Sequence, residues 1–385
     1  MLTIGMGALL ILIGYFLGLA FGSATAGLVI ALLIWAILSL IGYFQGDSIL
    51  LSMSGAKKIS RDDHPRLYNV VEEMKIASGL EKVPDIYIID DPALNAFATG
   101  RDPNKASVAI TSGLLQKLNR DELQGVIGHE ISHIKNRDVL LMAMCSVVLG
   151  TIVILAWYGS RFLFWGGAGS RRSSSSRGGG QGQIIILVVA LVFMILAPIF
   201  AQLIYFAISR KREYLADASS ALYTRYPEGL ASALEKLGTA TGQLRSANKA
   251  TAPMYIVNPF RQQGMQASDL TSTHPPISER IRILRAMAGA SFNDYEQAYR
   301  QAHGGKGVIP AASLAAATVP IKTIKLEGEA GELNEIQRAR ETSDVMWRLS
   351  NYNTITCDCG AKLRVPPQFK EPIIKCPRCG RTHQV

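Results

Sequence analysis

Two histidines and a glutamate lie within five consecutive residues of this 385-residue chain, as His129-Glu130-Ile131-Ser132-His133. On a helix, positions i and i+4 share one face, so both imidazoles can reach one metal ion. Glu130 would lie beside that ion without binding it, and it could act as a general base toward a metal-activated water. The pattern is typical of hydrolytic zinc sites, although five residues alone also match by chance.

A catalytic zinc site requires a third protein ligand and one open position. The best candidate is Glu213, in the stretch Glu213-Tyr214-Leu215-Ala216-Asp217. Asp217 lies four residues later on the same helical face, where it could accept a hydrogen bond from a ligand imidazole. The alternative is that both acids form surface ion pairs with the basic residues Arg210, Lys211 and Arg212.

A second set of metal-binding residues lies near the C-terminus, where four of the five cysteines form two pairs, each followed by glycine: Cys357, Cys359, Cys376 and Cys379. Paired thiolates at this spacing predict a structural zinc site in a module that resembles a zinc ribbon. Two disulfides are the alternative, but they need an oxidising compartment. So short a module cannot bury a sufficient core, and we expect zinc to supply its folding energy. Substrate docking, partner binding and stability all remain open as its role.

Long uncharged stretches must position these residues at a membrane. Charged residues make up 18% of the chain, against about 25% in an ordinary soluble domain. A membrane-spanning helix needs about 20 apolar residues. We predict four such spans, at Ile4–Phe21, Gly27–Phe44, Val139–Trp157 and Ile184–Ile208. The alternative is that these are core helices of a large soluble protein, but four runs without a charge argue against it.

Four spans would place both termini and both long polar segments on one side of the membrane. Lysines and arginines flank the spans on that side, which predicts that it is cytoplasmic. The four arginines of the opposite loop, Arg161, Arg171, Arg172 and Arg177, weaken this asymmetry. We expect a multi-pass protein of the inner or plasma membrane. Its net charge of +10 fits contact with the headgroups of an anionic bilayer, and no basic helix interleaved with aromatics points to nucleic acid.

The predicted fold is mainly α, with four transmembrane helices, a zincin-like α+β catalytic domain and a small zinc ribbon. Its parts are a transmembrane hairpin (1–45), the first half of the catalytic domain (46–138), a second hairpin (139–209), the second half (210–300), a linker (301–350) and the cysteine module (351–385). Within the polar parts we expect helices over Asp62–Ser78, Asp121–Asn136, Arg210–Ala240 and Ile277–Ala290, and strands over Asp85–Ile89, Asn95–Thr99 and Ser107–Thr111.

Four blocks follow one another along the chain: residues 95–100 (Asn-Ala-Phe-Ala-Thr-Gly), the His-Glu-x-x-His before one predicted span, the Glu-Tyr-Leu-Ala-Asp after the next, and residues 273–281 (Thr-His-Pro-Pro-Ile-Ser-Glu-Arg-Ile). In this order they resemble the HtpX family of membrane metalloproteases, which is related to the CAAX prenyl proteases. The similarity covers roughly residues 1 to 290 and does not extend to the cysteine module. It implies a zinc endopeptidase that cleaves damaged or misfolded membrane proteins on the cytoplasmic side. His129, His133 and Glu213 would be its ligands and Glu130 its base.

His274 and Arg280 are candidates for stabilising the oxyanion that forms during peptide hydrolysis. The resemblance favours this role. The alternative is that His274 and the two following prolines form a rigid turn, with Arg280 paired to an acid such as Asp217.

An edge strand containing Asn95, Ala96, Phe97 and Ala98 could bind substrate through main-chain hydrogen bonds, or it could be an ordinary hairpin strand. His64 and His303 have no partner at ligand spacing, and we predict that both face solvent.

Two other classes of function compete with a zinc endopeptidase at the membrane rim. One is an intramembrane zinc protease, which keeps its metal motif inside an apolar span. Charged residues flank the motif here, which argues against that class. The other is a non-enzymatic membrane anchor that presents a zinc ribbon to nucleic acid or protein. It would leave His129, Glu130, His133 and Glu213 without a role.

Overall fold

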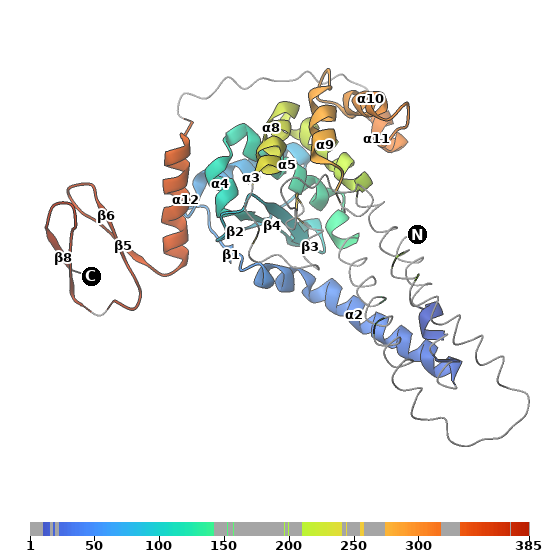
Figure 1. Ribbon diagram of the computed structural model, residues 1–385, viewed down its shortest axis with the longest axis horizontal. Coiled ribbons are helices and arrows are strands. Elements are labelled where there is room, and N and C mark those ends of the chain that lie inside the picture. The colour runs from blue at the N-terminus through green and yellow to red at the C-terminus, as the bar shows by residue number, and fades with distance from the viewer. Residues whose placement is uncertain are drawn as a thin grey trace, which may run out of the picture.

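The computed structural model describes residues 11–15, 18–19, 23–141, 152, 157, 196, 199, 210–240, 244, 255–257, 274–316, 332–369 and 371–384. A long helix, α2 (Ala24–Met53), projects from a mixed domain of helices and strands, and a small β module lies on another side of that domain (Figure 1).

Among the described residues, α2 is the one helix long and apolar enough to cross a membrane, with a mean hydropathy of 2.5. Its apolar side chains stand 54–57% exposed at Val29, Ile30, Leu33, Ile37, Leu40 and Phe44. It contains the predicted span Gly27–Phe44 and continues nine residues beyond it. Most residues of the other three predicted spans, Ile4–Phe21, Val139–Trp157 and Ile184–Ile208, lie outside the described residues.

A four-stranded sheet with the order β1-β2-β4-β3 forms the centre of the mixed domain. Its strands are β1 (Lys57–Lys58), β2 (Asp85–Ile89), β3 (Ala96–Gly100) and β4 (Ala106–Thr111). The β2 and β4 strands pair in parallel, and β3 pairs antiparallel to β4 as the outermost strand. The three expected strands are therefore present, each within one residue of its predicted bounds.

The two faces of the sheet bury alternate side chains, as the period of a strand requires. Ile88, Ala98 and Ile110 face the main core, where α3 (Pro65–Ser78) and α5 (Arg120–Lys135) pack. On the other face, Phe97 and Ala109 pack against Leu51, near the C-terminal end of α2. Helix α2 therefore contacts the same sheet that supports α5.

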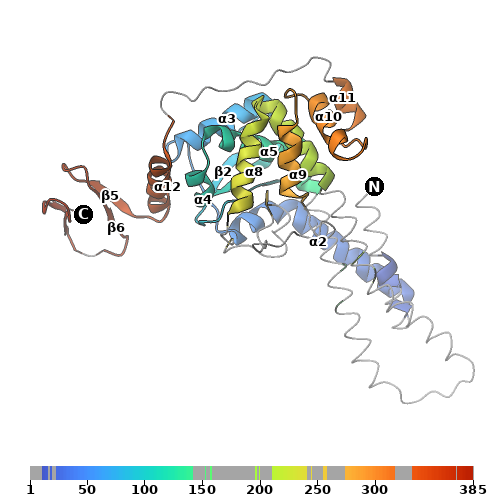
Figure 2. The same ribbon diagram turned by 45° about the horizontal axis from the view of Figure 1, so that its top comes forward.

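A helix over residues 210–224 and α8 (Pro227–Thr239) pack against α5 (Figure 2). The expected single helix Arg210–Ala240 is thus two helices, because Arg225 adopts a left-handed φ of 54° and Pro227 starts α8. Where α5 and α8 cross, a Cβ on Gly125 would lie 2.6 Å from the backbone N of Leu230, and one on Gly229 would lie 2.7 Å from the carbonyl O of Asp121. The helices meet backbone to backbone.

The remaining elements are η1 (Pro103–Lys105), α4 (Ser112–Lys117), α9 (Ile277–Arg285), α10 (Phe292–Ala302), α11 (Ala311–Ala316), α12 (Glu335–Leu349) and the hairpin strands β5 (Asn353–Thr356), β6 (Lys362–Val365), β7 (Ile373–Lys375) and β8 (Thr382–Gln384). Helix α9 ends five residues before the predicted Ala290. Helix α5 begins at Arg120, one residue before the expected start at Asp121, and a capping box between Asn119 and Glu122 fixes this start.

Helix α12 corrects the expectation of a linker over residues 301–350. It packs on α4, with Val345 and Thr342 almost fully buried, and it lies between the domain and the β module in Figure 1. Arg66 of α3 pairs with Glu341 at 3.3 Å, and Lys57 donates to the carbonyl O of Leu349 at 3.1 Å. The weak apolar pattern of this segment hid the helix, because its docking relies largely on charged and polar groups.

His64 lies beneath this helix and is fully buried, so its predicted exposure to solvent is wrong. Its Nδ1 accepts a hydrogen bond from the backbone N–H of Leu67 at 3.2 Å, which caps α3. Burial, together with the charge of Arg66, lowers the pKa of His64 to about 4. The neutral imidazole of His64 therefore has a structural role as the N-cap of α3.

We expect Met346→Ala in α12 to lower the free energy of unfolding by about 2 kcal/mol, because Met346 is 8% exposed and packs on the main core. Ile336→Ala is the matched control on the same helix, since Ile336 is 64% exposed and its loss should cost about 0.5 kcal/mol or less. Urea unfolding in detergent measures both. Equal losses would show that α12 is not part of the folded core.

Candidate active site and second metal centre

Helix α5 carries the His-Glu-x-x-His motif through the centre of the domain, so His129 and Glu130 are almost fully buried. The Nε2 atoms of His129 and His133 lie 3.2 Å apart, and their rings are nearly perpendicular. Both nitrogens point to one position beside the helix, as the i, i+4 spacing predicts.

Glu213, on the helix over residues 210–224, completes a group of three donors. Its Oε2 lies 3.5 Å from Nε2 of His129, and its Oε1 lies 3.4 Å from Nε2 of His133. Zinc bonds of 2.0–2.1 Å in a tetrahedron would separate neighbouring donors by about 3.3 Å. The three side chains therefore fit one zinc ion and leave a fourth position for water or substrate.

Each imidazole also contacts a carboxylate through its other nitrogen. Nδ1 of His129 lies 3.0 Å from Asp217, and Nδ1 of His133 lies 3.1 Å from Asp138. Such contacts fix the tautomer and the ring orientation of metal-binding histidines. The sequence predicted Asp217 but missed Asp138, which also pairs with Arg212, the neighbour of Glu213. The signal was present: an acid five residues after His133 and a cation directly before Glu213.

Arg280 is fully buried behind His129 and donates two hydrogen bonds to Asp217, at 2.6 and 2.8 Å. It also lies 3.3 Å from Oε2 of Glu213. This is the pairing with Asp217 that the sequence left open as the alternative to an oxyanion role. The guanidinium lies between the two carboxylates and favours the ionised form of both.

His274 belongs to the same cluster, with Nδ1 3.1 Å from Oε2 of Glu213 and only 6% of the residue exposed. The structure thus brings His274 beside the three donors, although it lies 61 positions beyond Glu213 in the sequence. An imidazole there can donate to an oxygen that gains negative charge near the metal position.

The charges of the cluster favour a bound cation. Burial opposes ionisation of Glu213, but the charge of His274 and hydrogen bonds from His129 and His133 hold the pKa of its carboxyl well below the usual range. Burial likewise lowers the pKa of the two ligand-type histidines, but hydrogen bonds to Asp217 and Asp138 outweigh it and raise both values. The site therefore holds positive charge readily, whether as protons or as a metal ion.

Glu130 lies on α5, which packs against the edge strand β3, and the backbone of Ala98 favours its charged form. Burial raises the pKa of Glu130. A carboxyl of this kind takes up a proton more readily than an exposed glutamate, as a general base requires. Asn95, Ala96, Phe97 and Ala98 are all buried in or next to β3.

His303 corrects the second prediction of a solvent-facing histidine. Its Nε2 lies 2.6 Å from Oε1 of Glu279, which also accepts a hydrogen bond from the hydroxyl of Tyr214 at 2.6 Å. Its ring stacks on Tyr299 with 3.9 Å between ring centroids. The contact ties the end of α10 to α9 and to the residue after Glu213.

The four cysteines converge at the tips of two hairpins. The Sγ atoms of Cys357 and Cys379 lie 3.4 Å apart, and those of Cys359 and Cys376 lie 3.7 Å apart. All four are free thiols, and zinc–sulfur bonds of 2.3 Å would separate tetrahedral donors by about 3.8 Å. Gly360 and Gly380 turn the chain after each pair at φ of 81° and 76°, a region that favours glycine.

The backbone of the second turn also favours a thiolate. A hydrogen bond from the backbone of Cys379, opposed by partial desolvation and supplemented by the backbone of Arg378, lowers the pKa of Cys376 to about 7. The pKa of Cys379 is instead raised by its sulfur neighbours, so the fit to a zinc site with four thiolate ligands rests on the spacing of the four sulfurs.

Comparison with known proteins agrees with this geometry. The family model for peptidase family M48 matches residues 61–288. A protease HtpX homolog from Dictyoglomus turgidum is 48% identical over 261 residues, which are 68% of this chain and 82% of that protein. One from Thermoanaerobacter pseudethanolicus is 44% identical over 279 residues, 72% of this chain and 91% of the relative.

Among solved structures, the crystal structure of S. mikatae Ste24p matches with a TM-score of 0.43 and 20% identity, covering 72% of this chain and 62% of that one. The segment that matches the family model spans the motif, Glu213 and His274 together. The chain therefore belongs to peptidase family M48 and is a metalloprotease similar to the HtpX proteases.

Proposed function

We propose that this chain is a zinc endopeptidase at the cytoplasmic face of the membrane, where it cleaves misfolded or damaged membrane proteins. The observation that carries the proposal is the group of three donors, His129, His133 and Glu213, spaced 3.2–3.5 Å apart as one zinc ion needs. When bound there, zinc would supply Lewis-acid polarisation of a water and of the substrate carbonyl.

Each neighbouring side chain has a defined task in this reaction. Glu130 takes a proton from the attacking water and passes it to the leaving amine as the carbon–nitrogen bond breaks. Asp217 and Asp138 hold the imidazoles in the tautomer that leaves Nε2 free for the metal. Arg280 holds Asp217 and Glu213, while His274 donates a hydrogen bond toward the developing oxyanion.

The edge strand β3 is the proposed substrate strand. Asn95, Ala96, Phe97 and Ala98 lie in or beside the outermost strand of the sheet, adjacent to Glu130. A peptide added to this edge would be held by main-chain hydrogen bonds that ignore side-chain identity. Such binding suits unfolded segments of many sequences.

The membrane location is supported by α2, whose apolar side chains are exposed along the predicted span. We propose four spans with cytoplasmic termini, because lysines and arginines flank the polar side. The four cysteines would hold a second, structural zinc, which makes the C-terminal module a fixed part of the folded chain.

Glu130→Gln should lower the rate of cleavage of an unfolded model substrate by about 10²–10⁴-fold, because the general base is lost. Zinc content should stay unchanged, since Glu130 is not a ligand. Metal analysis and a peptidase assay on the detergent-purified chain measure both, with Glu228→Gln, the exposed partner of Arg285, as the matched control. Cleavage at the unaltered rate would sink the assignment of the base.

Asp217→Asn should weaken zinc binding by about 10–100-fold, because His129 and Arg280 lose the charge that orients them. Competition with a chromophoric chelator gives the affinity. Asp85→Asn, which removes only an exposed partner of Lys58, is the control and should bind zinc as the parent does. An unchanged affinity for Asp217→Asn would show that the contact has no part in holding the metal.

Cys376→Ser should reduce bound zinc from two ions to one per chain and leave cleavage of a soluble unfolded substrate intact, because the two sites use separate residues. Cys145→Ser is the matched control, since that cysteine is not one of the four. If Cys376→Ser kept both ions, the ribbon site would be wrong. If the parent chain held only a single ion that this variant loses, the catalytic zinc would be wrong instead.

A further inference from the structure

Along the outer edge of β3, only every second residue directs its backbone N–H and C=O groups toward a possible partner strand. The backbone N–H of Thr111 donates to the carbonyl O of Asn95 at 3.0 Å, so Asn95 faces β4. Because hydrogen-bonding direction alternates along an antiparallel ladder, Phe97 and Thr99 also face β4. Ala96, Ala98 and Gly100 are left to face outward.

The Ala96 end of this edge is already covered by another segment of the chain. The backbone N–H of Ile256 donates to the carbonyl O of Ala96 at 3.0 Å, and the side-chain amide of Asn95 donates to the carbonyl O of Val257 at 2.9 Å. Tyr255 is fully buried and packs edge-on against Phe97. A peptide added to β3 therefore cannot continue along the edge past Ala96.

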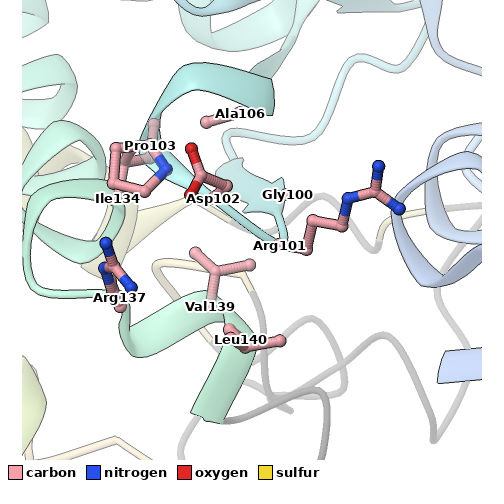
Figure 3. A pocket seen from close by; sticks show the side chains of 9 residues that line it. All are labelled: Gly100, Arg101, Asp102, Pro103, Ala106, Ile134, Arg137, Val139 and Leu140. Carbon is pink, nitrogen blue, oxygen red and sulfur yellow. The ribbon is translucent and has the colours of Figure 1, made fainter. Parts of the chain in front are cut away.

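The Gly100 end has no such cover among the described residues. A hollow adjoins it, lined in part by Ile134 at the end of α5 and by Val139 and Leu140 (Figure 3). Val139 and Leu140 are the first residues of a predicted span. The edge of β3 is thus covered at its Ala96 end, and a small hollow adjoins its Gly100 end.

Contacts with α2 show which end lies nearer the membrane. The guanidinium of Arg101 lies 5.3 Å from the ring of Phe44 and 5.7 Å from that of Tyr43, at the end of the predicted span, and Figure 3 shows it turned toward that helix. The Ala96 end of β3 instead lies near Ser54, whose hydroxyl is 3.3 Å from that of Tyr255. Phe44 and Ser54 are ten residues apart, about 15 Å along a helix. The Gly100 end of β3 is therefore the end nearer the membrane.

We propose that the site takes a peptide segment that emerges from a membrane span, enters β3 at Gly100 and runs antiparallel toward Ala96, so that the span lies N-terminal to the scissile bond. The inference rests on the proposed peptidase function. Antiparallel pairing is the more stable ladder, and it puts the N-terminal part of the substrate opposite Gly100. Arg101 lies three positions after Ala98, the strand residue beside Glu130, which is about 10 Å of extended chain.

The test uses one unfolded segment in three settings: directly after a membrane span, directly before a span, and without a span. The full chain is reconstituted in liposomes with each substrate, and the Glu130→Gln chain is the blank. No substitution in the edge strand is needed, so misfolding cannot mimic the result. Both anchored substrates gain the same local concentration, and only their direction differs.

We expect the span-first substrate to be cut about tenfold faster than the span-last substrate, because tethering favours only the orientation in which the substrate pairs with the edge of β3. Mass spectrometry should place its cuts within about ten residues of the span, given the short path from Arg101 to Ala98. Equal rates for the two anchored substrates, with the span-free segment also cut, would overturn the inference and leave the peptidase intact. If no substrate is cut, the proposed peptidase function fails and the inference falls with it.

Discussion

The buried ion pair between Arg280 and Asp217 is the interaction on which the rest of the site depends. Arg280 contacts Glu213 and Asp217 on one donor helix, and its Nη2 lies 3.4 Å from Nδ1 of His129 on the other, so one guanidinium connects both. Without it, two carboxylates would face each other in the interior at a large desolvation cost. The price of this arrangement is a site in which no charged member can be removed without leaving another unpaired.

The same logic extends outward through polar contacts. Asp138 links His133 to Arg212, and Glu279 links Tyr214 to His303 on the end of α10. Apolar packing of the sheet and helices supplies the framework, but these charged contacts set the orientation of the side chains within it. The C-terminal helix α12 attaches by similar means, through Glu341 and the carbonyl of Leu349.

The residues of the candidate site could be predicted because their spacing in the sequence implies a shared face on a helix. The i, i+4 histidines required a helix, and the acids four apart in residues 213–217 required another, so the cluster followed once both were placed together. Asp138 escaped prediction because it follows the end of α5 at Lys135, where helical spacing no longer indicates a shared face. The partner of His303 escaped because a single histidine has no spacing to reveal it. Helix α12 was not predicted for a different reason. Polar residues such as Arg338 and Thr342 are buried in it, and polar residues in a sequence do not indicate burial.

The glycines at the crossing of α5 and α8 have a consequence for how this enzyme can change over evolutionary time. Because Gly125 and Gly229 let the two backbones touch, their separation does not depend on the volume of any side chain. Leucines and valines in the surrounding core can be replaced by larger or smaller residues, and other contacts than this crossing would adjust. The motif helix would keep its place through such drift, while an alanine at either glycine would push α5 itself aside.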